Sequence, residues 1–200
     1  MDYYQIIANN FQATIETIAL SVDQLAEPIA QASQLMTQAL LEDHKILACG
    51  NGADAALAQL FTCNLLNHFA RERPALPALT LAGDSASITA IAHSDGLEET
   101  FARQVRALGQ PGDILLCLSS SVAAGNIARA IAAARERDMP IIILDNGADS
   151  ELSGLLGAGD IELPVSAARQ SSVVELHTMV LHALCELIDH NLFGPEHQEP

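Results

Sequence analysis

The stretch that decides the fold is KILACGNGAD, residues 45–54. A short apolar run leads into a glycine-rich turn, and the turn leads into a segment with helical spacing of apolar residues that ends near residue 69. The stretch ILLCLSSS, residues 114–121, has the same form, with serines in place of the glycines. Apolar strands that alternate with helices are typical of a parallel sheet covered on both faces. The sequence therefore predicts an α/β protein.

The same alternation continues along the whole chain. We expect strands at residues 45–49, 78–81, 114–118, 140–144 and 160–163, with helices between them and a long last helix from about 169 to 192. Residues 1–42 are helical by pattern and are expected to form two helices, the second starting at Pro28. Residues 1–200 are thus predicted to be one domain, with residues 43–200 as its α/β core.

Composition and charge exclude several kinds of partner. The chain has 25 acidic and 9 basic residues, a net charge of −16, which disfavours nucleic acids and anionic membranes. No apolar run reaches the roughly 18 residues of a membrane span, and the N-terminus lacks the pattern of a signal peptide. We expect a cytoplasmic protein. Half of the residues are hydrophobic, so some of their apolar surface is expected to be buried between the subunits of a homo-oligomer.

Two loops are candidate binding sites for an anion. In a parallel sheet, ligands bind beyond the carboxyl ends of the strands, where helix N-termini present free N–H groups. The residues expected to bind a ligand are Asn51, Gly52 and Asp54 in the first loop, and Ser119, Ser120 and Ser121 in the second. The alternative is that these are ordinary turns in which Asp54 or Ser121 caps the following helix.

Several stretches together are similar to a known family. The strand with its GNG turn, ERPALPAL at 72–79, QVRALGQPGDILL at 104–116 and CELIDHNLF at 185–193 resemble the sugar isomerase (SIS) family. Within it, the match is to the phosphoheptose isomerases and the related DnaA initiator-associating protein. The resemblance implies a five-stranded parallel sheet between helices, a homotetramer, and a phosphosugar cavity at subunit interfaces.

The resemblance also implies which residues of this chain correspond to the catalytic positions of the active relatives. Those relatives are expected to bind zinc at these positions. A His and a Glu on the helix after the first loop correspond to Leu60 and Asn64 here, and a Gln and a His on the last helix correspond to Val174 and His182. A zinc site needs three or four ligands, so His182 alone does not make one, and no metal is predicted. The alternative for His182 is a packed core or interface residue. His177 lies about 140° around the same helix from His182, so the two do not converge.

The phosphate loops differ from the family pattern as well. Asp54 stands where the family has a serine, and Val122 stands where it has a glycine. Two unit charges 4 Å apart repel by about 4 kcal/mol at an effective dielectric constant of about 20. We therefore expect Asp54 to disfavour a bound phosphate.

Three functions are weighed on these grounds. The first is a non-catalytic protein resembling the initiator-associating protein, which would contact a basic replication initiator, with Leu192 and Phe193 as a possible contact or else packed in the core. The second is an isomerase of sedoheptulose 7-phosphate. The third is a phosphosugar sensor that binds its ligand without converting it. The missing catalytic side chains favour the first.

Overall fold

The computed structural model describes residues 2–121, 124–148 and 150–195. Its centre is a five-stranded, fully parallel sheet in the order β2-β1-β3-β4-β5. The strands are β1 (Ile46–Cys49), β2 (Ala78–Thr80), β3 (Ile114–Ser119), β4 (Ile141–Asp145) and β5 (Ile161–Pro164). Every residue of β1, β3 and β4 is buried, as expected for apolar strands covered on both faces. The predicted α/β class and parallel sheet are confirmed.

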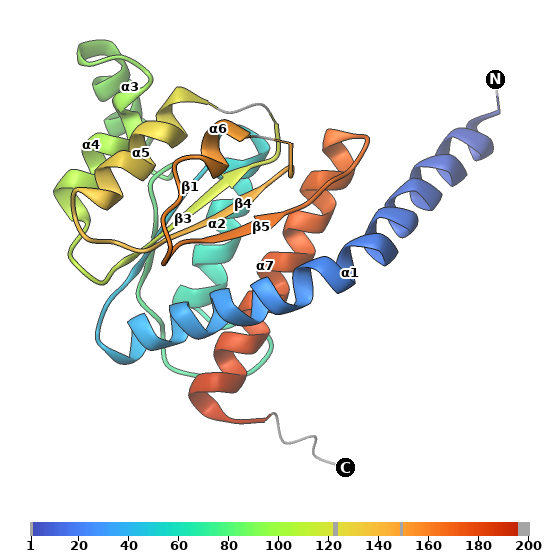
Figure 1. Cartoon of the computed structure of the whole chain (residues 1–200), viewed down its shortest axis with the longest axis horizontal. Helices are drawn as coiled ribbons and strands as arrows, with labels where there is room; N and C mark the ends of the chain where they lie inside the picture. The colour runs from blue at the N-terminus through green and yellow to red at the C-terminus, as the bar shows by residue number, and fades with distance from the viewer. Residues whose placement is uncertain (1, 122–123, 149, 196–200) are drawn as a thin grey trace.

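Helices cover both faces of the sheet (Figure 1). They are α1 (Tyr3–Leu41), α2 (Ala53–Leu66), α3 (Ser85–Ser94), α4 (Glu99–Leu108), α5 (Gly125–Arg135), α6 (Ser150–Ser153) and α7 (Gln170–Phe193). One core cluster joins α1, α2 and α7 to one side of the sheet, and a second joins α4 and α5 to the other. The domain therefore has the predicted three layers.

The prediction of two N-terminal helices is wrong, because α1 runs unbroken through Pro28. A proline inside a helix removes one backbone hydrogen bond and usually ends or kinks the helix. Here Leu25 and Ala32, on either side of Pro28, are both buried in the cluster that α1 shares with α7. Packing of this continuous face outweighs the local cost of the proline. The first turns of α1 project from the domain (Figure 1), and further along the helix the Thr14 hydroxyl donates to Glu175 of α7 at 2.6 Å.

The last helix is apolar because it lies in the core. By length and composition α7 could cross a membrane, but half of the apolar window that qualifies it is buried inside the domain. It packs against both α1 and α2. Its hydrophobic residues are therefore used to join the helical layer to the sheet.

Candidate functional site

The two predicted loops meet at the point where the strand order reverses. After β1 the chain passes through α2 to β2, and after β3 it passes through α5 to β4, on the opposite side of the sheet. Because β1 and β3 are neighbours in register, with Cys49 opposite Cys117, the loops that follow them lie side by side. This is where parallel α/β sheets place their ligands.

Two glycines shape the first loop. A Cβ atom on Gly50 would lie 2.7 Å from the backbone carbonyl carbon of Asp54, so only glycine lets the start of α2 come this close to the end of β1. Gly52 has φ of +57°, a conformation that side chains with a Cβ seldom adopt. It is the N-cap of α2. The loop therefore turns directly from the strand into the helix.

The carboxylate of Asp54 joins the two loops. Its Oδ2 accepts hydrogen bonds from the backbone N–H of Ser120 at 2.9 Å and from the Ser120 hydroxyl at 3.0 Å. Asp54 is only 3% exposed, so it lies beneath the second loop and not on its open side. The alternative that Asp54 or Ser121 is an N-cap is wrong, because the N-caps of α2 and α5 are Gly52 and Ala124.

The serines of the second loop have different surroundings. Ser119 and Ser120 are buried, whereas Ser121 is exposed. The Ser119 hydroxyl donates to the backbone carbonyl of Ser121 at 3.5 Å, and the side-chain amide of Gln170 donates to the Ser120 hydroxyl at 3.4 Å. Val122, which was expected to hinder approach to a ligand, lies outside the described residues.

A pair of amides joins the first loop to the start of α5. The side chains of Asn51 and Asn126 donate to each other, with both N–O distances 2.8 Å. Asn126 belongs to the first turn of α5 and is buried, and its amide also reaches the Thr100 hydroxyl at 3.5 Å. Sequence reasoning selected Asn51 but missed Asn126, whose only signal is a polar side chain in the first turn after the second loop.

His177 is a further residue of the site that sequence reasoning set aside. Its ring is fully buried, and Nε2 lies 3.0 Å from the backbone oxygen of Asp145 at the end of β4. Its Nδ1 lies 3.9 Å from Oδ1 of Asp54. Within the described part of the chain, neither Nδ1 of His177 nor Oδ1 of Asp54 has a hydrogen-bond partner. Since 123 residues separate Asp54 from His177 in the sequence, only the tertiary fold brings them together.

The four positions of the expected catalytic cluster do not form a metal site. Leu60 and Val174 are aliphatic and pack against the core, and the Asn64 side chain lies beside the Cys185 thiol. The ring of His182 lies against Phe69, with the ring centres 5.2 Å apart. Within the described part of the chain, no three His, Cys, Asp or Glu residues are placed to hold a metal ion. These side chains do not fit zinc, since one imidazole is too few ligands.

Leu192 and Phe193, expected either to contact a partner or to pack in the core, lie at the end of α7. Both are partly buried and pack against the core cluster of α1, α2 and α7. The guanidinium of Arg71 lies 5.7 Å from the centre of the Phe193 ring and donates to the backbone carbonyl of Gly194 at 2.7 Å. The end of α7 is thus held against the domain.

Comparison with known proteins agrees with this architecture. The SIS domain model matches residues 10–145, and the chain belongs to the SIS domain family. Within that family it falls in the phosphoheptose isomerase group. It is 45% identical over 190 residues, 95% of this chain and 96% of the relative, to the phosphoheptose isomerase of Pseudoalteromonas atlantica. It is also 45% identical to that of Alkalilimnicola ehrlichii, over 97% of this chain and 99% of the relative.

Two solved structures of phosphoheptose isomerases are also similar to this chain. The phosphoheptose isomerase of Francisella tularensis superposes with a TM-score of 0.92 at 38% identity, covering 95% of this chain and 100% of that one. The enzyme from Neisseria gonorrhoeae gives a TM-score of 0.89 at 36% identity, covering 94% of this chain and 99% of that one.

These relatives overturn the main functional prediction. The interpretation as a non-catalytic protein resembling the initiator-associating protein is wrong, because the relatives matched over nearly their whole length are named phosphoheptose isomerases. That interpretation gave the three substituted catalytic positions, Leu60, Asn64 and Val174, more weight than the similarity of the remaining chain. The isomerase alternative is the one that the comparisons favour.

Proposed function

We propose that this protein is an isomerase of phosphorylated sugars that acts in the cytoplasm, with sedoheptulose 7-phosphate as its substrate. The observation that carries the proposal is the 45% identity to a phosphoheptose isomerase over 95% of the chain. The neighbouring loops after β1 and β3, at the reversal of the strand order, are the part of the fold suited to a sugar phosphate.

The phosphate would bind at the second loop and the adjoining helix N-termini. The exposed Ser121 offers a hydroxyl, and the start of α5 directs N–H groups and the positive end of the helix dipole toward the second loop. The Asn51–Asn126 amide pair would hold the first loop at a fixed distance from α5. These groups bind and orient the ligand.

The reaction needs a group that moves a proton between adjacent sugar carbons. Among positions 60, 64, 174 and 182, only His182 carries a side chain that accepts a proton near neutral pH. We assign it the role of base. No step is assigned to zinc, because the residues at these positions do not fit it.

Turnover tests the proposal directly. The purified protein is incubated with sedoheptulose 7-phosphate in chelator-treated buffer and, separately, with added zinc, and product is measured by chromatography. We expect turnover in the wild type, a loss of at least about 100-fold in His182→Ala, and wild-type rates in His190→Ala, which removes an exposed histidine of the same helix. Absence of turnover in both buffers would refute the proposed activity.

The side chains at positions 60, 64 and 174 favour a second candidate, a phosphosugar sensor that binds without conversion. Two aliphatic residues and an amide supply no acid or base there. A rise in melting temperature with sedoheptulose 7-phosphate, together with no product in either buffer, would favour the sensor. A rise in melting temperature with turnover favours the enzyme.

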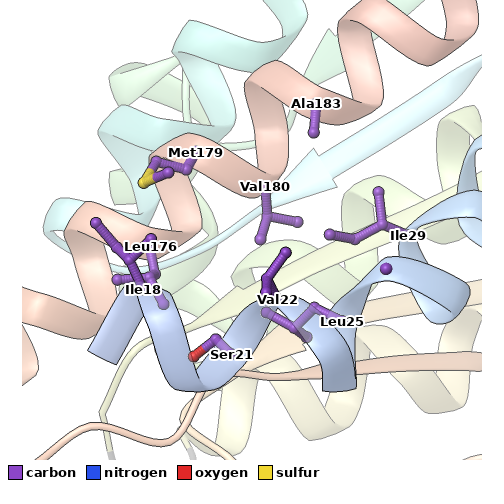
Figure 2. A pocket seen from close by; sticks show the side chains of 10 residues that line it. Ile18, Ser21, Val22, Leu25, Ile29, Leu176, Met179, Val180 and Ala183 are labelled. Atoms are coloured by element: carbon purple, nitrogen blue, oxygen red, sulfur yellow. The ribbon is translucent and has the colours of Figure 1, made fainter. Parts of the chain in front are cut away.

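We further propose that the protein is a homotetramer. Apolar side chains along the first half of α1 are exposed, namely Tyr3, Tyr4, Ile6, Ile7, Phe11, Ile15, Leu20 and Val22. An apolar groove of about 190 Å³ lies between α1 and α7, with Val22 and Ile29 on one wall and Met179 and Val180 on the other (Figure 2). Since α1 supplies both an exposed apolar row and a wall of the groove, a second copy of α1 is the proposed occupant.

A further inference from the structure

The hydrogen bond between His177 and Asp145 determines where one ring proton lies. A backbone carbonyl oxygen only accepts hydrogen bonds. Nε2, 3.0 Å from the oxygen of Asp145, therefore carries the hydrogen. In a neutral imidazole the other nitrogen, Nδ1, would then have a lone pair and no hydrogen.

That nitrogen faces a carboxylate oxygen that is also without a donor. Nδ1 of His177 and Oδ1 of Asp54 are 3.9 Å apart, and each lacks a hydrogen-bond partner among the described atoms. Both residues are almost fully buried. Two acceptors that face each other without a proton repel, and burial makes an unpaired charge costly. The two atoms are too far apart for a hydrogen bond, but one added proton removes the unpaired charge, either as an imidazolium beside the carboxylate or as a carboxylic acid.

We propose that Asp54 and His177 share one proton, so that together they carry no net charge. The proton lies on Nδ1, giving an imidazolium beside a carboxylate, or on Oδ1, giving a neutral imidazole beside a carboxylic acid. In either form Oδ2 of Asp54 still accepts the two hydrogen bonds from Ser120. His177 is thus a positioning residue that acts on the second loop through Asp54.

Described groups of β4, α7 and the loop after β3 lie around the pair. Besides Asp54 of α2, β4 contributes the Asp145 carboxylate, which accepts the backbone N–H of Gly147 at 2.9 Å. The loop after β3 contributes the uncharged Ser120, and α7 contributes the uncharged Gln170. Among these groups, the ones whose charge a proton can change are therefore the Asp54–His177 pair and the buried Asp145 carboxylate.

The shared proton bears on substrate binding, and this part rests on the proposed function. From sequence, Asp54 was expected to repel a phosphate. A neutral Asp54–His177 pair exerts much less repulsion than an isolated carboxylate, while it keeps the loop in place. By neutralising Asp54, His177 would then allow this chain to bind a sugar phosphate.

The first test counts the proton and does not depend on function. Long-range ¹H–¹⁵N spectra give the protonation of each ring nitrogen of His177, assigned by loss of its signals in His177→Gln, and ¹³C spectra give the ionisation of Asp54. We expect at pH 7 an imidazolium with a carboxylate, or a neutral ring with a carboxylic acid. In Asp54→Ser, a neutral ring with hydrogen on Nε2 is expected. A neutral ring beside an ionised Asp54 in the wild type would overturn the proposal.

The second test measures affinity for inorganic phosphate and for sedoheptulose 7-phosphate by calorimetry. His177→Gln leaves Asp54 charged and should weaken binding of both at least tenfold, whereas Asp54→Asn/His177→Gln removes the charge and should recover affinity to within about threefold of wild type. Equal weakness of the single and double variants, with both folded by circular dichroism, would refute the charge compensation. If the wild type binds neither anion, the proposed function fails while the spectra still decide the shared proton.

Discussion

Arg73 and Asp189 form a buried ion pair that ties the segment between α2 and β2 to α7. Nε of Arg73 lies 2.6 Å from Oδ1 of Asp189, and the two side chains are 1% and 4% exposed. The same guanidinium donates to the backbone carbonyls of Leu65 and Asn64 at 2.7 and 2.8 Å. It therefore joins one oxygen of the carboxylate to the end of α2, whereas Oδ2 of Asp189 has no hydrogen-bond partner among the described residues.

Removing Arg73 should be costly. Arg73→Ala leaves Asp189 buried and unpaired, and we expect a loss of about 3–5 kcal/mol in the free energy of unfolding. Urea denaturation followed by circular dichroism measures it. The matched control is Arg103→Ala, which breaks a more exposed pair with Asp95 and should cost less than about 1 kcal/mol. Equal losses in the two variants would contradict this interpretation.

The Asn51–Asn126 amide pair should support both stability and binding. Asn126→Ala leaves the Asn51 amide without its partner and should cost about 1–3 kcal/mol in urea denaturation. It should also weaken sedoheptulose 7-phosphate binding, measured by calorimetry, because the first loop loses its tie to α5. Gln59→Ala, at an exposed position of α2, should change neither quantity. Unchanged stability in Asn126→Ala would show that the pair contributes nothing.

The cysteines should differ sharply in reactivity. Cys63 is exposed, whereas Cys49, Cys117 and Cys185 are buried. Burial raises the pKa of the Cys185 thiol to about 12, and the hydrogen bond with Cys49 raises that of Cys117. Because the thiolate is the reactive form, Ellman's reagent at pH 8 should modify Cys63 rapidly and the other three only on unfolding. Rapid modification of native Cys63→Ser would contradict this.

The raised pKa of Cys185 predicts a loss of stability at alkaline pH. The pKa is about 12 in the folded chain against an ordinary value of 9.0 for a cysteine thiol, so the unfolded state releases this proton first as the pH rises. The stabilisation that the protonated Cys185 thiol gives to the folded state is fully present below pH 9. Between pH 9 and 12 it is lost, by up to about 1.4 kcal/mol in the free energy of unfolding per pH unit. Urea denaturation from pH 8 to 11 should give a flatter decline for Cys185→Ala than for wild type. Cys63→Ala should keep the wild-type slope.

Charging the exposed row of α1 should prevent assembly. Phe11→Glu places a carboxylate at an apolar position that is exposed in the isolated chain, and burying it between subunits would be unfavourable. Light scattering coupled to size exclusion should report a tetramer for the wild type and a smaller species for the variant. Gln12→Glu, the neighbouring polar position, should leave the mass unchanged. A monomeric wild type would refute the proposed assembly.

The sequence predicts those features that arise from neighbouring residues. The apolar runs of β1, β3 and β4 and the glycines at positions 50 and 52 are local signals, and they correctly predict the sheet and the meeting of two loops at its edge. Continuity of α1 through Pro28 is not a local property, since it depends on the packing of Leu25 and Ala32 on both sides.

The candidate site is harder to predict from the sequence, because its contacts join segments that are distant along the chain. Asp54 could be placed in the first loop, but its burial under Ser120 and its approach to His177 follow from the arrangement of α2, β3 and α7. The repulsion of phosphate was assigned to an isolated charge, since nothing in the sequence indicates that a histidine 123 residues away lies beside it.

The projecting start of α1 has a consequence for how the protein behaves on dilution. Its first turns carry exposed apolar side chains and extend beyond the body of their own chain (Figure 1). If copies of α1 cover one another, mass action governs how much of this helix is formed, and the melting temperature rises with protein concentration. Folding of the first turns of α1 and association of the chains would then be thermodynamically coupled.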